Sequence, residues 1–486
     1  MHTIKVQSTG CYFRPDSKRV LVRPFIPTDE TLVQNIVNRA LALSAQEIDD
    51  QLAVLNEDFD NRHVNIEGYW QRNFETVKNR LHITDELSAR RQVYIGALFS
   101  GEYALESAAL FNPSLVAHPD QTGVAPGALR FVLSLRATGE GHISSIEFRS
   151  GVIKFSGEVE VDDVVPLVVA PELKKNPTYQ KQIFLHKLRE MGFENDWSAL
   201  IMKSLGESFT HQELTSSIRA AAEHEEHQPR EEERTMECLD WLARSNYEIH
   251  FSPDSAFSQR IIFPVSANES NGIEDARFVR FEDDDGSVCY YATYTAYNGR
   301  AILPQFIETT DFLNFRVRTL NGSAVQNKGM ALFPRKINGQ FAMISRQDDA
   351  NLFLMFSDNL HFWNEPHFLR QPLYPWEFVK IGNCGSPIET EHGWLVITHG
   401  VGPMRRYCIG AMLLDLENPT KIIGCLEKPL LEPKGGDREG YVPNVVYSCG
   451  GIIHRGKLIL PYALSDTSST IGIIDLDELT QTILRK

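Results

Sequence analysis

The chain has 486 residues, of which 42% are hydrophobic and 23% are charged. These fractions are typical of globular proteins and exclude a disordered or fibrous chain. The length allows about three domains of roughly 150 residues, or one repeat architecture with an additional part. The net charge of −16 argues against binding to nucleic acid or anionic lipid, although it is compatible with a local basic pocket for a small anion.

The first residues contain no basic segment followed by an apolar one, and no run approaches the ~20 apolar residues that a membrane span needs. The seven cysteines are widely spaced and form no Cys-x-x-Cys pair. An odd number of scattered cysteines is typical of free thiols in a reducing compartment. We therefore expect a cytoplasmic protein without a membrane anchor, a disulfide framework, a metal site or another cofactor.

The N-terminal region, residues 1–92, has the pattern of a mostly helical unit after a short extended start. Apolar residues recur at helical spacing after Asp29, which is a candidate N-cap residue. The segment Ser44-Ala-Gln-Glu47 has the spacing of a capping box and predicts the start of a second helix. Residues 65–82 and 87–110 are expected to form two further helices.

A second, Glu-rich helical stretch covers about residues 173–246. The rest of the chain is rich in β-branched and aromatic residues, with Gly, Asn and Asp at short intervals, which is typical of strands and turns. One unit recurs in this part, in which a turn with Gly precedes a very apolar strand that ends in polar residues. The copies begin at Gly127, Gly286, Gly339, Gly393 and Gly456.

A period of about 50 residues with several strands in each unit is typical of a β-propeller blade. Five copies predict a mainly β fold, namely a five-bladed β-propeller over residues 93–486 with the second helical stretch as an insertion. The alternative is a β-sandwich in which the Gly spacing is coincidental. We favour the propeller because the polar strand ends recur in register with the glycines.

The innermost strands of a propeller line a central channel, so polar residues at the strand ends of successive blades should converge there. Clustered cationic side chains in such a channel indicate a phosphate or carboxylate ligand. An acid beside them is a candidate general acid. The polar residues concerned are Asn112, Arg136, Asp275, Asn298, Arg300, Lys328, Arg346, His399, Asn444 and Asp466, with the loop at 382–385.

Several segments of this part resemble motifs of the β-mannoside phosphorylases of glycoside hydrolase family 130. The resemblance covers about residues 100–155 and 248–486, and the two helical parts are not found in short members of that family. Ala276 stands where the family motif has Pro. The segments are Phe111-Asn-Pro-Ser114, Gly272-Ile-Glu-Asp-Ala-Arg277, Asn327-Lys-Gly-Met-Ala-Leu-Phe-Pro334, Gly393-Trp-Leu-Val-Ile-Thr-His-Gly-Val401, Glu439-Gly-Tyr-Val-Pro-Asn-Val-Val446 and Tyr462-Ala-Leu-Ser-Asp-Thr467.

The resemblance implies a five-bladed propeller in which Asp275 is the catalytic acid. It also implies an inverting single displacement, in which inorganic phosphate, as co-substrate, attacks the anomeric carbon of a non-reducing β-mannosyl unit. The acid protonates the leaving oxygen through a sugar hydroxyl, and the products are α-mannose 1-phosphate and a shortened acceptor. Asp275 must then carry a proton, which requires a raised pKa.

The resemblance and the expected channel together assign roles to further residues. The implied phosphate ligands are Arg136, Lys328, Arg346 and His399, with Asn298 and Arg300 as additions. The candidates for contacts with the sugar are Asn112, Glu274, Tyr407, Glu439 and Asp466. Further candidate sugar platforms are Tyr294, Tyr297 and Trp376, for which packing in the core is an equally good explanation.

Two alternatives to a phosphorylase remain open from the sequence. An inverting hydrolase of the same family needs a second carboxylate, ~6.5–9.5 Å from the acid, to activate a water molecule, and Asp348, Asp349 and Glu439 are the candidates. The retained basic residues favour phosphorolysis. A non-catalytic glycan-binding propeller is the second alternative, against which the motif around Asp275 argues.

The expected partners are a β-mannoside oligosaccharide and phosphate, without nucleic acid or a membrane. The added helices are candidates for a lid over the channel or for an interface in a homo-oligomer.

Overall fold

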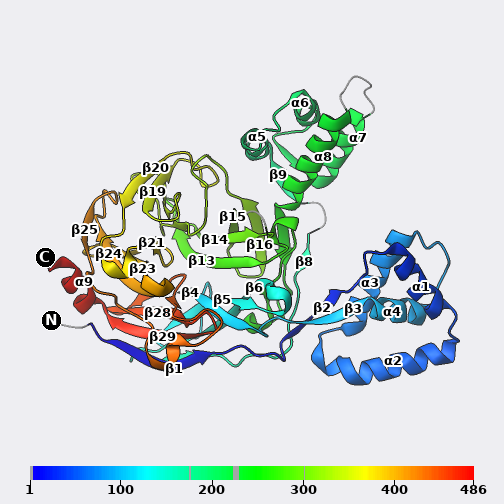
Figure 1. Cartoon of the computed structure of the whole chain (residues 1–486), viewed down its shortest axis with the longest axis horizontal. Helices are drawn as coiled ribbons and strands as arrows, with labels where there is room; N and C mark the ends of the chain where they lie inside the picture. Colours follow the sequence, from blue (N-terminus) through cyan, green and yellow to red (C-terminus); the bar gives the residue numbers. More distant parts are fainter. Residues whose placement is uncertain (1–3, 175–176, 223–228, 300–301, 486) are drawn as a thin grey trace.

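The computed structural model describes residues 4–174, 177–222, 229–299 and 302–485 (Figure 1). Over these residues the chain forms a β body from which two groups of helices project (Figure 1). The protein is therefore mainly β with added helices, as the sequence predicts.

The β body contains five antiparallel sheets of four to six strands. The first has the order β12 (Ile261–Ile262), β6 (Ser144–Ile153), β5 (Leu129–Thr138) and β4 (Ala109–Ala117), and β7 (Val159–Val161) pairs with β6. The second has the order β13 (Ile273–Glu282), β14 (Val288–Tyr297), β15 (Ile302–Thr309), β16 (Asn314–Thr319), β11 (Tyr247–His250) and β8 (Glu172–Leu173).

The other three sheets follow along the chain. The third contains β17 (Ala331–Leu332), β18 (Phe341–Ser345), β19 (Leu352–Ser357) and β20 (Pro366–Arg370). The fourth contains β21 (Lys380–Asn383), β23 (Gly393–Gly402), β24 (Arg406–Leu414) and β25 (Ile422–Cys425), and β22 (Ile388–Thr390) pairs with β23. The fifth contains β26 (Val446–Tyr447), β28 (Lys457–Leu464), β29 (Ser468–Asp475) and β1 (Val6–Phe13), and β27 (Ile452–His454) pairs with β28.

Each sheet contacts the next one along the chain, and the last contacts the first. The first sheet meets the second through β4 and β13, the second meets the third through β14 and β17, and the third meets the fourth through β18 and β21. The fourth meets the fifth through β24 and β26, and β28 of the fifth meets β4 of the first. The five glycine-initiated strands of the sequence repeat are β5, β14, β18, β23 and β28, one in each sheet.

The N-terminal strand β1 completes the fifth sheet by pairing with β29, where Val6 lies opposite Ile474. The first and the last strand of the described residues therefore belong to one sheet. Phe13 at the end of β1 is buried in a cluster with Leu110 and Ile471, whereas its neighbour Tyr12 is 53% exposed.

The first group of helices follows a short strand, β2 (Val20–Pro24), and precedes its partner β3 (Ser100–Ala104). Asp29 and the capping box of Ser44 with Glu47 begin α1 and α2 as expected. The helix expected at residues 87–110 is shorter than predicted, because residues 100–110 lie in β3, a connecting segment and the start of β4. The helices are α1 (Glu30–Leu41), α2 (Ala45–Phe59), α3 (Ile66–Leu81) and α4 (Ala89–Leu98).

The second group lies between β8 and β11 of the second sheet. It contains a two-stranded sheet and four helices around their own apolar cluster, which includes Trp197 and Leu239. The elements are β9 (Thr178–Gln180), α5 (Lys181–Glu190), α6 (Asp196–Lys203), β10 (Ser208–Thr210), α7 (His211–Ala222) and α8 (Pro229–Arg244). Outside this group, the C-terminal helix α9 (Leu476–Leu484) packs on the fourth and fifth sheets. The division of the chain at residue 92 stays a prediction.

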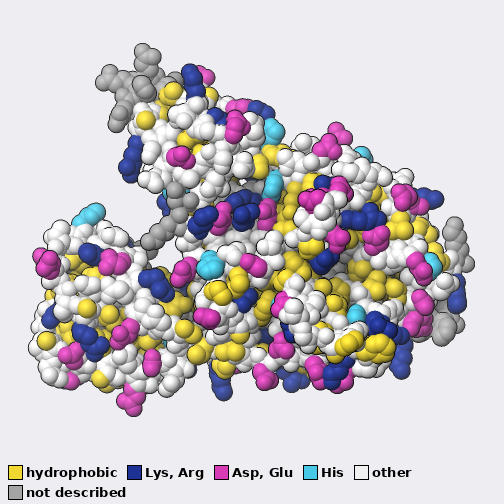
Figure 2. Space-filling model, turned by 180° about the vertical axis from the view of Figure 1, so that it is seen from behind, with side chains coloured by type: hydrophobic (Ala, Val, Ile, Leu, Met, Phe, Trp, Pro, Cys, Tyr) yellow, Lys and Arg dark blue, Asp and Glu magenta, His cyan; other side chains and the backbone are white. Residues whose placement is uncertain are grey.

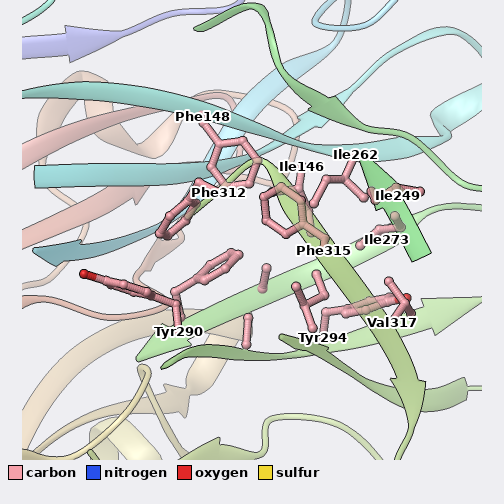
Figure 3. Packing of buried hydrophobic residues seen from close by; sticks show 14 of the residues in the cluster. Ile146, Phe148, Ile249, Ile262, Ile273, Tyr290, Tyr294, Phe312, Phe315 and Val317 are labelled. Carbon is pink, nitrogen blue, oxygen red and sulfur yellow. The ribbon is translucent and has the colours of Figure 1, made fainter. Parts of the chain in front are cut away.

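Aromatic side chains fill the space between the first two sheets (Figure 3). Phe148 of β6 lies 5.7 Å from Phe312 and 5.9 Å from Phe315, measured between ring centroids, and these two residues flank the turn into β16. This packing fixes β13, which carries the central motif of the site. On the outer face shown in Figure 2, acidic and basic side chains are interspersed.

Candidate active site

The central motif begins with a close contact between the first two sheets. Gly272 has a φ of 123°, and a Cβ atom there would lie 2.6 Å from the backbone nitrogen of Ser144. The hydroxyl of Ser144 donates a hydrogen bond of 2.9 Å to the carbonyl of Ile273. Only glycine permits this conformation and approach, so Gly272 determines where β13 starts.

Asp275 lies at an irregularity in the pairing of β13 with β14, and its φ of 55° is left-handed. Asn112 has a φ of 49° at a similar irregularity in β4. Such bulges turn a side chain out of the regular alternation of a strand. The two side chains meet, because the Asn112 amide donates a hydrogen bond of 2.5 Å to the Asp275 carboxylate.

Arg136 on β5 joins both acidic residues of the motif. Its Nη1 lies 3.3 Å from Asp275 Oδ1, and its Nη2 lies 2.8 Å from Glu274 Oε1. Lys328, which precedes β17, approaches the other oxygen of Glu274 at 3.6 Å. Three sheets therefore contribute to one group of charges, as the sequence predicts for the strand ends.

The surroundings of Asp275 set its pKa in the free site. Burial is the largest single influence and raises the pKa of Asp275, whereas the charges of Arg136 and Lys328 lower it. The charge of Arg277 and the hydrogen bond from Asn112 lower the pKa further, so it lies below the usual value for aspartate. Without a ligand, Asp275 is therefore ionised at neutral pH.

Asp466, after β28, has the opposite tendency. Burial is the main cause that raises its pKa to about 7; the charge of Arg136 opposes this shift, and that of Asp275 adds to it. Its backbone is left-handed, with a φ of 48°. Two carboxylates close to Arg136 therefore differ in protonation near neutral pH, which is typical of acid and base sites.

Arg277 is a functional candidate to which sequence reasoning assigned no role. It is 3% exposed, and its Nη2 donates a hydrogen bond of 2.6 Å to the hydroxyl of Tyr447 on β26. A sequence signal existed, because Arg277 ends the central motif and follows Asp275 by two positions on one strand. Tyr447 directly follows the motif at residues 439–446, but it was not part of any motif found in the sequence.

A second cationic group lies around Arg346, which follows β18 and is 5% exposed. Its Nη2 lies 3.1 Å from Asp349 Oδ1, and Lys380 Nζ lies 2.7 Å from Asp349 Oδ2. Its Nη1 lies 3.5 Å from His399 Nε2. The charges of both Arg277 and Arg346 act on His399, so the two cationic groups are neighbours.

His399, which the resemblance implies as a phosphate ligand, is neutral in the free site. The residue is 2% exposed, and burial, with the charges of Arg346 and Arg277, holds its pKa well below the ordinary value. Its Nδ1 lies 3.3 Å from the carbonyl of Asn383, which assigns the proton to Nδ1 and leaves Nε2 as the acceptor for Arg346. His399 is therefore a neutral partner of Arg346.

The candidate sugar contacts differ in their surroundings. The Tyr407 ring stacks on His399 with centroids 5.9 Å apart and is half-buried. Tyr294 is 2% exposed and its hydroxyl bonds Glu269, so it belongs to the core between the sheets and not to a sugar platform. Glu439 is exposed in the loop before β26.

Three further predicted positions are Asn298, Arg300 and Asp348. Asn298 follows β14 and is half-buried, and Arg300 lies outside the described residues. Asp348 accepts hydrogen bonds from the backbone nitrogens of Ala350 and Asn351, which is the arrangement of a turn. Asp348 is therefore explained as a turn residue. The carboxylate of Asp349 pairs with Arg346 and Lys380.

Several buried polar atoms of the network have no hydrogen-bond partner within the described part of the chain. They are Asn112 Oδ1, Arg136 Nε, Arg277 Nε, Arg346 Nε and Asn383 Oδ1. Buried polar groups are normally paired, so a cluster of unpaired ones indicates a place where a polar ligand or water binds. The cations suit an anion, and the carboxylates suit sugar hydroxyls.

Within the described ranges, no group of three or more His, Cys, Asp and Glu side chains is arranged to hold a metal ion. None of the helices in those ranges combines the length and the apolar character that crossing a lipid bilayer requires. The seven cysteine thiols are all free.

Comparison with known proteins identifies the class of this site. A model of glycoside hydrolase family 130, described as beta-1,4-mannooligosaccharide phosphorylase, matches residues 242–485. A 1,2-beta-oligomannan phosphorylase of a Thermoanaerobacter species is 33% identical over 247 residues, which are 49% of this chain and 81% of that protein. A beta-1,2-mannobiose phosphorylase of Listeria innocua is 28% identical over 353 residues, 69% of this chain and 90% of that protein.

The crystal structure of the Listeria innocua beta-1,2-mannobiose phosphorylase with beta-1,2-mannobiose covers 79% of this chain and 94% of its own, with 20% identity and a TM-score of 0.46.

The protein is an enzyme, and its named relatives are glycoside phosphorylases. The family model matches half of the chain, so the chain belongs to glycoside hydrolase family 130, as the motifs predict.

Proposed function

We propose that the protein is an inverting glycoside phosphorylase that cleaves a non-reducing β-mannosyl linkage with inorganic phosphate. The observation that carries this proposal is the set of cations around Asp275 and Glu274. These cations come from different parts of the β body. Arg136 and Lys328 lie on one side, and Arg277 and Arg346 continue the group. Fixed cations of this kind stabilise the charge of an attacking phosphate.

In the proposed reaction a phosphate oxygen attacks the anomeric carbon from the face opposite the leaving group. The new carbon–oxygen bond forms as the glycosidic bond breaks, so the configuration inverts. The leaving oxygen takes a proton that Asp275 supplies through a sugar hydroxyl. The products are α-mannose 1-phosphate and an acceptor with a new hydroxyl group.

The low pKa of Asp275 in the free site is compatible with this role. The cations that lower the pKa, Arg136 and Lys328, are those proposed to bind phosphate. A phosphate dianion beside them offsets their charge, so the pKa of Asp275 rises when the substrates bind. Phosphate therefore both attacks the sugar and prepares the acid.

The roles of the remaining candidates follow from their positions. Asp466, protonated near neutral pH, and Asn112 are proposed to bind sugar hydroxyls, together with Glu274, Tyr407 and Glu439. Arg346 is proposed as a phosphate ligand that the neutral His399 orients, and Asn298 and Arg300 stay proposed additions.

Mannose as the sugar is inferred from the relatives, whose names cover beta-1,2 and beta-1,4 linkages. We therefore propose a β-mannoside substrate class and treat the linkage as a result of the assay. The proposal includes a five-bladed propeller, which is supported by the cyclic contacts of the five sheets and by the pairing of β1 with β29.

The test is a panel of β-1,2-, β-1,3- and β-1,4-linked mannobioses, each incubated with and without phosphate. We expect mannose 1-phosphate only when phosphate is present, and much slower formation of it by Asp275→Asn. Free mannose at equal rates with and without phosphate contradicts phosphorolysis. That result indicates the hydrolase, whose base would then be sought at Asp349 and Glu439.

A further inference from the structure

Lys328 ends a loop whose other end contacts the inserted helices. Residues 320–328, here called the 320–328 loop, connect β16 of the second sheet with the third sheet. The loop begins beside α5, the first helix of the second helical group (Figure 1). It ends at Lys328, which approaches Glu274 at 3.6 Å. The inserted helices and the site are therefore joined by one short segment.

Two side chains of α5 hold the start of the 320–328 loop. Glu190 Oε1 accepts a hydrogen bond of 2.5 Å from the backbone nitrogen of Gly322. Lys187 Nζ lies 3.3 Å from the carbonyl of Leu320 and 3.0 Å from Glu190 Oε2. Lys187 is 9% exposed, whereas Glu190 lies at the surface. The pairing with Lys187 orients the Glu190 carboxylate toward the backbone nitrogen of Gly322.

Other contacts support the same attachment. His186 of α5 packs edge-on against Phe362, with ring centroids 4.4 Å apart, and Phe362 forms a bridge with Asn321 of the loop. Asn246, which follows α8, accepts a hydrogen bond of 2.9 Å from the backbone nitrogen of Thr319. Both ends of the inserted group therefore contact the start of the loop.

Consecutive hydrogen bonds stiffen the 320–328 loop between Gly322 and Lys328. The backbone nitrogen of Val325 donates to the carbonyl of Gly322 at 2.9 Å, and that of Gln326 donates to the carbonyl of Ala324 at 3.0 Å. The backbone nitrogen of Lys328 donates to the side chain of Asn327 at 3.0 Å. These bonds hold the backbone from Gly322 to Gln326 and the turn at Asn327, directly before Lys328.

The 320–328 loop also reaches the second cationic group. The side chain of Asn327 hydrogen-bonds Asp349, the carboxylate that pairs with Arg346 and Lys380. The end of the loop therefore contacts both parts of the charged network.

We propose that Glu190 is a positioning residue that fixes the 320–328 loop and, through it, the phosphate-binding cation Lys328. The inference rests on the proposed phosphorolysis for the ligand at Lys328, but the contact between Glu190 and Gly322 does not depend on it. The inserted helices are then a support of the phosphate site and not only an addition to the surface.

The test compares Glu190→Ala with Glu194→Ala and Lys328→Ala. Glu194 is a matched control, because it pairs with exposed Arg189 close to the same helix end, at 2.6 Å. We expect Glu190→Ala to weaken phosphate binding, measured by calorimetry, and to raise KM for phosphate about tenfold, with KM for the mannoside unchanged. Glu190→Gln keeps an acceptor oxygen and should restore most of the affinity.

Hydrogen exchange separates this inference from the proposed function. In Glu190→Ala the amides of Gly322, Val325 and Lys328 should exchange faster than in Glu194→Ala, with or without phosphate. Unchanged exchange at these amides overturns the inference, as does unchanged phosphate affinity in Glu190→Ala when Lys328→Ala weakens it. If the unaltered enzyme binds no phosphate, the proposed function fails, and the exchange rates still decide whether Glu190 positions the loop.

Discussion

Asp275 combines an unusual backbone with contacts to two other residues, which makes it the most informative position to change. Asp275→Asn keeps the size of the side chain, so the packing and the hydrogen bond with Asn112 can persist with little loss of stability. We expect turnover to fall about 10²- to 10⁴-fold, because the proton donor is removed. The measurement is the initial rate of mannose 1-phosphate formation, with thermal unfolding as the control for the fold.

Turnover of Asp275→Asn within a few-fold of the unaltered enzyme contradicts its role as the acid. Asp466 would then be the next candidate, because its carboxyl holds a proton up to about pH 7.

The raised pKa of Asp466 has a consequence for stability. The pKa of Asp466 is about 7 in the folded state, compared with ~3.9 for an aspartate in the unfolded chain. At a pH below both values the group is protonated in both states, and its ionisation does not reduce the stability of the fold. Its unfavourable contribution grows as the pH rises from ~4 to ~7 and is constant above that. Asp466→Asn should therefore raise the unfolding temperature more at pH 8 than at pH 5.

The control for Asp466→Asn is Asp477→Asn, on the exposed side of α9 and remote from the site. A stability gain from Asp466→Asn that is equal at both pH values contradicts the raised pKa.

Among the elements, β1 offers a direct test of how the first strand packs in the fifth sheet. Phe13 and Tyr12 are neighbours on opposite faces of this strand, 6% and 53% exposed. Phe13→Ala should reduce the free energy of unfolding by ~3–5 kcal/mol, because it leaves a cavity in the cluster with Leu110. Tyr12→Ala should change it by less than about 0.5 kcal/mol. Equal effects in denaturant titrations would show that β1 is not packed as described.

The sequence predicted the elements well where the signal is local. The caps at Asp29 and Ser44 and the Gly-initiated strands of the five sheets depend on neighbouring residues, and all occur. Residues 99–110 were wrongly predicted as helix, because β3 pairs with β2, far away in the sequence. Phe99 instead ends α4, and its backbone nitrogen bonds the carbonyl of Gly96.

Protonation in the site was less predictable than position. The convergence of Arg136, Asp275 and Lys328 follows from the repeat, but the charge on each group depends on its neighbours in space. The neutral state of His399 and the raised pKa of Asp466 result from burial and from charges on other sheets. No local pattern contains that information.

At the scale of the whole molecule, the two groups of helices are additions to the five sheets of the β body. The second group contacts the loop that carries Lys328, so its presence and the phosphate site are physically connected. The cytoplasmic location and a homo-oligomer stay predictions, as does a lid formed by the first group.

The most direct measurement of the central claim is ³¹P NMR of one reaction mixture with a β-linked mannobiose and phosphate. For a phosphorylase, a phosphomonoester signal should grow as the phosphate signal falls, and the sugar formed should be α-mannose 1-phosphate. Unchanged phosphate while free mannose accumulates would contradict the account, because the cations around Asp275 would then serve no phosphate.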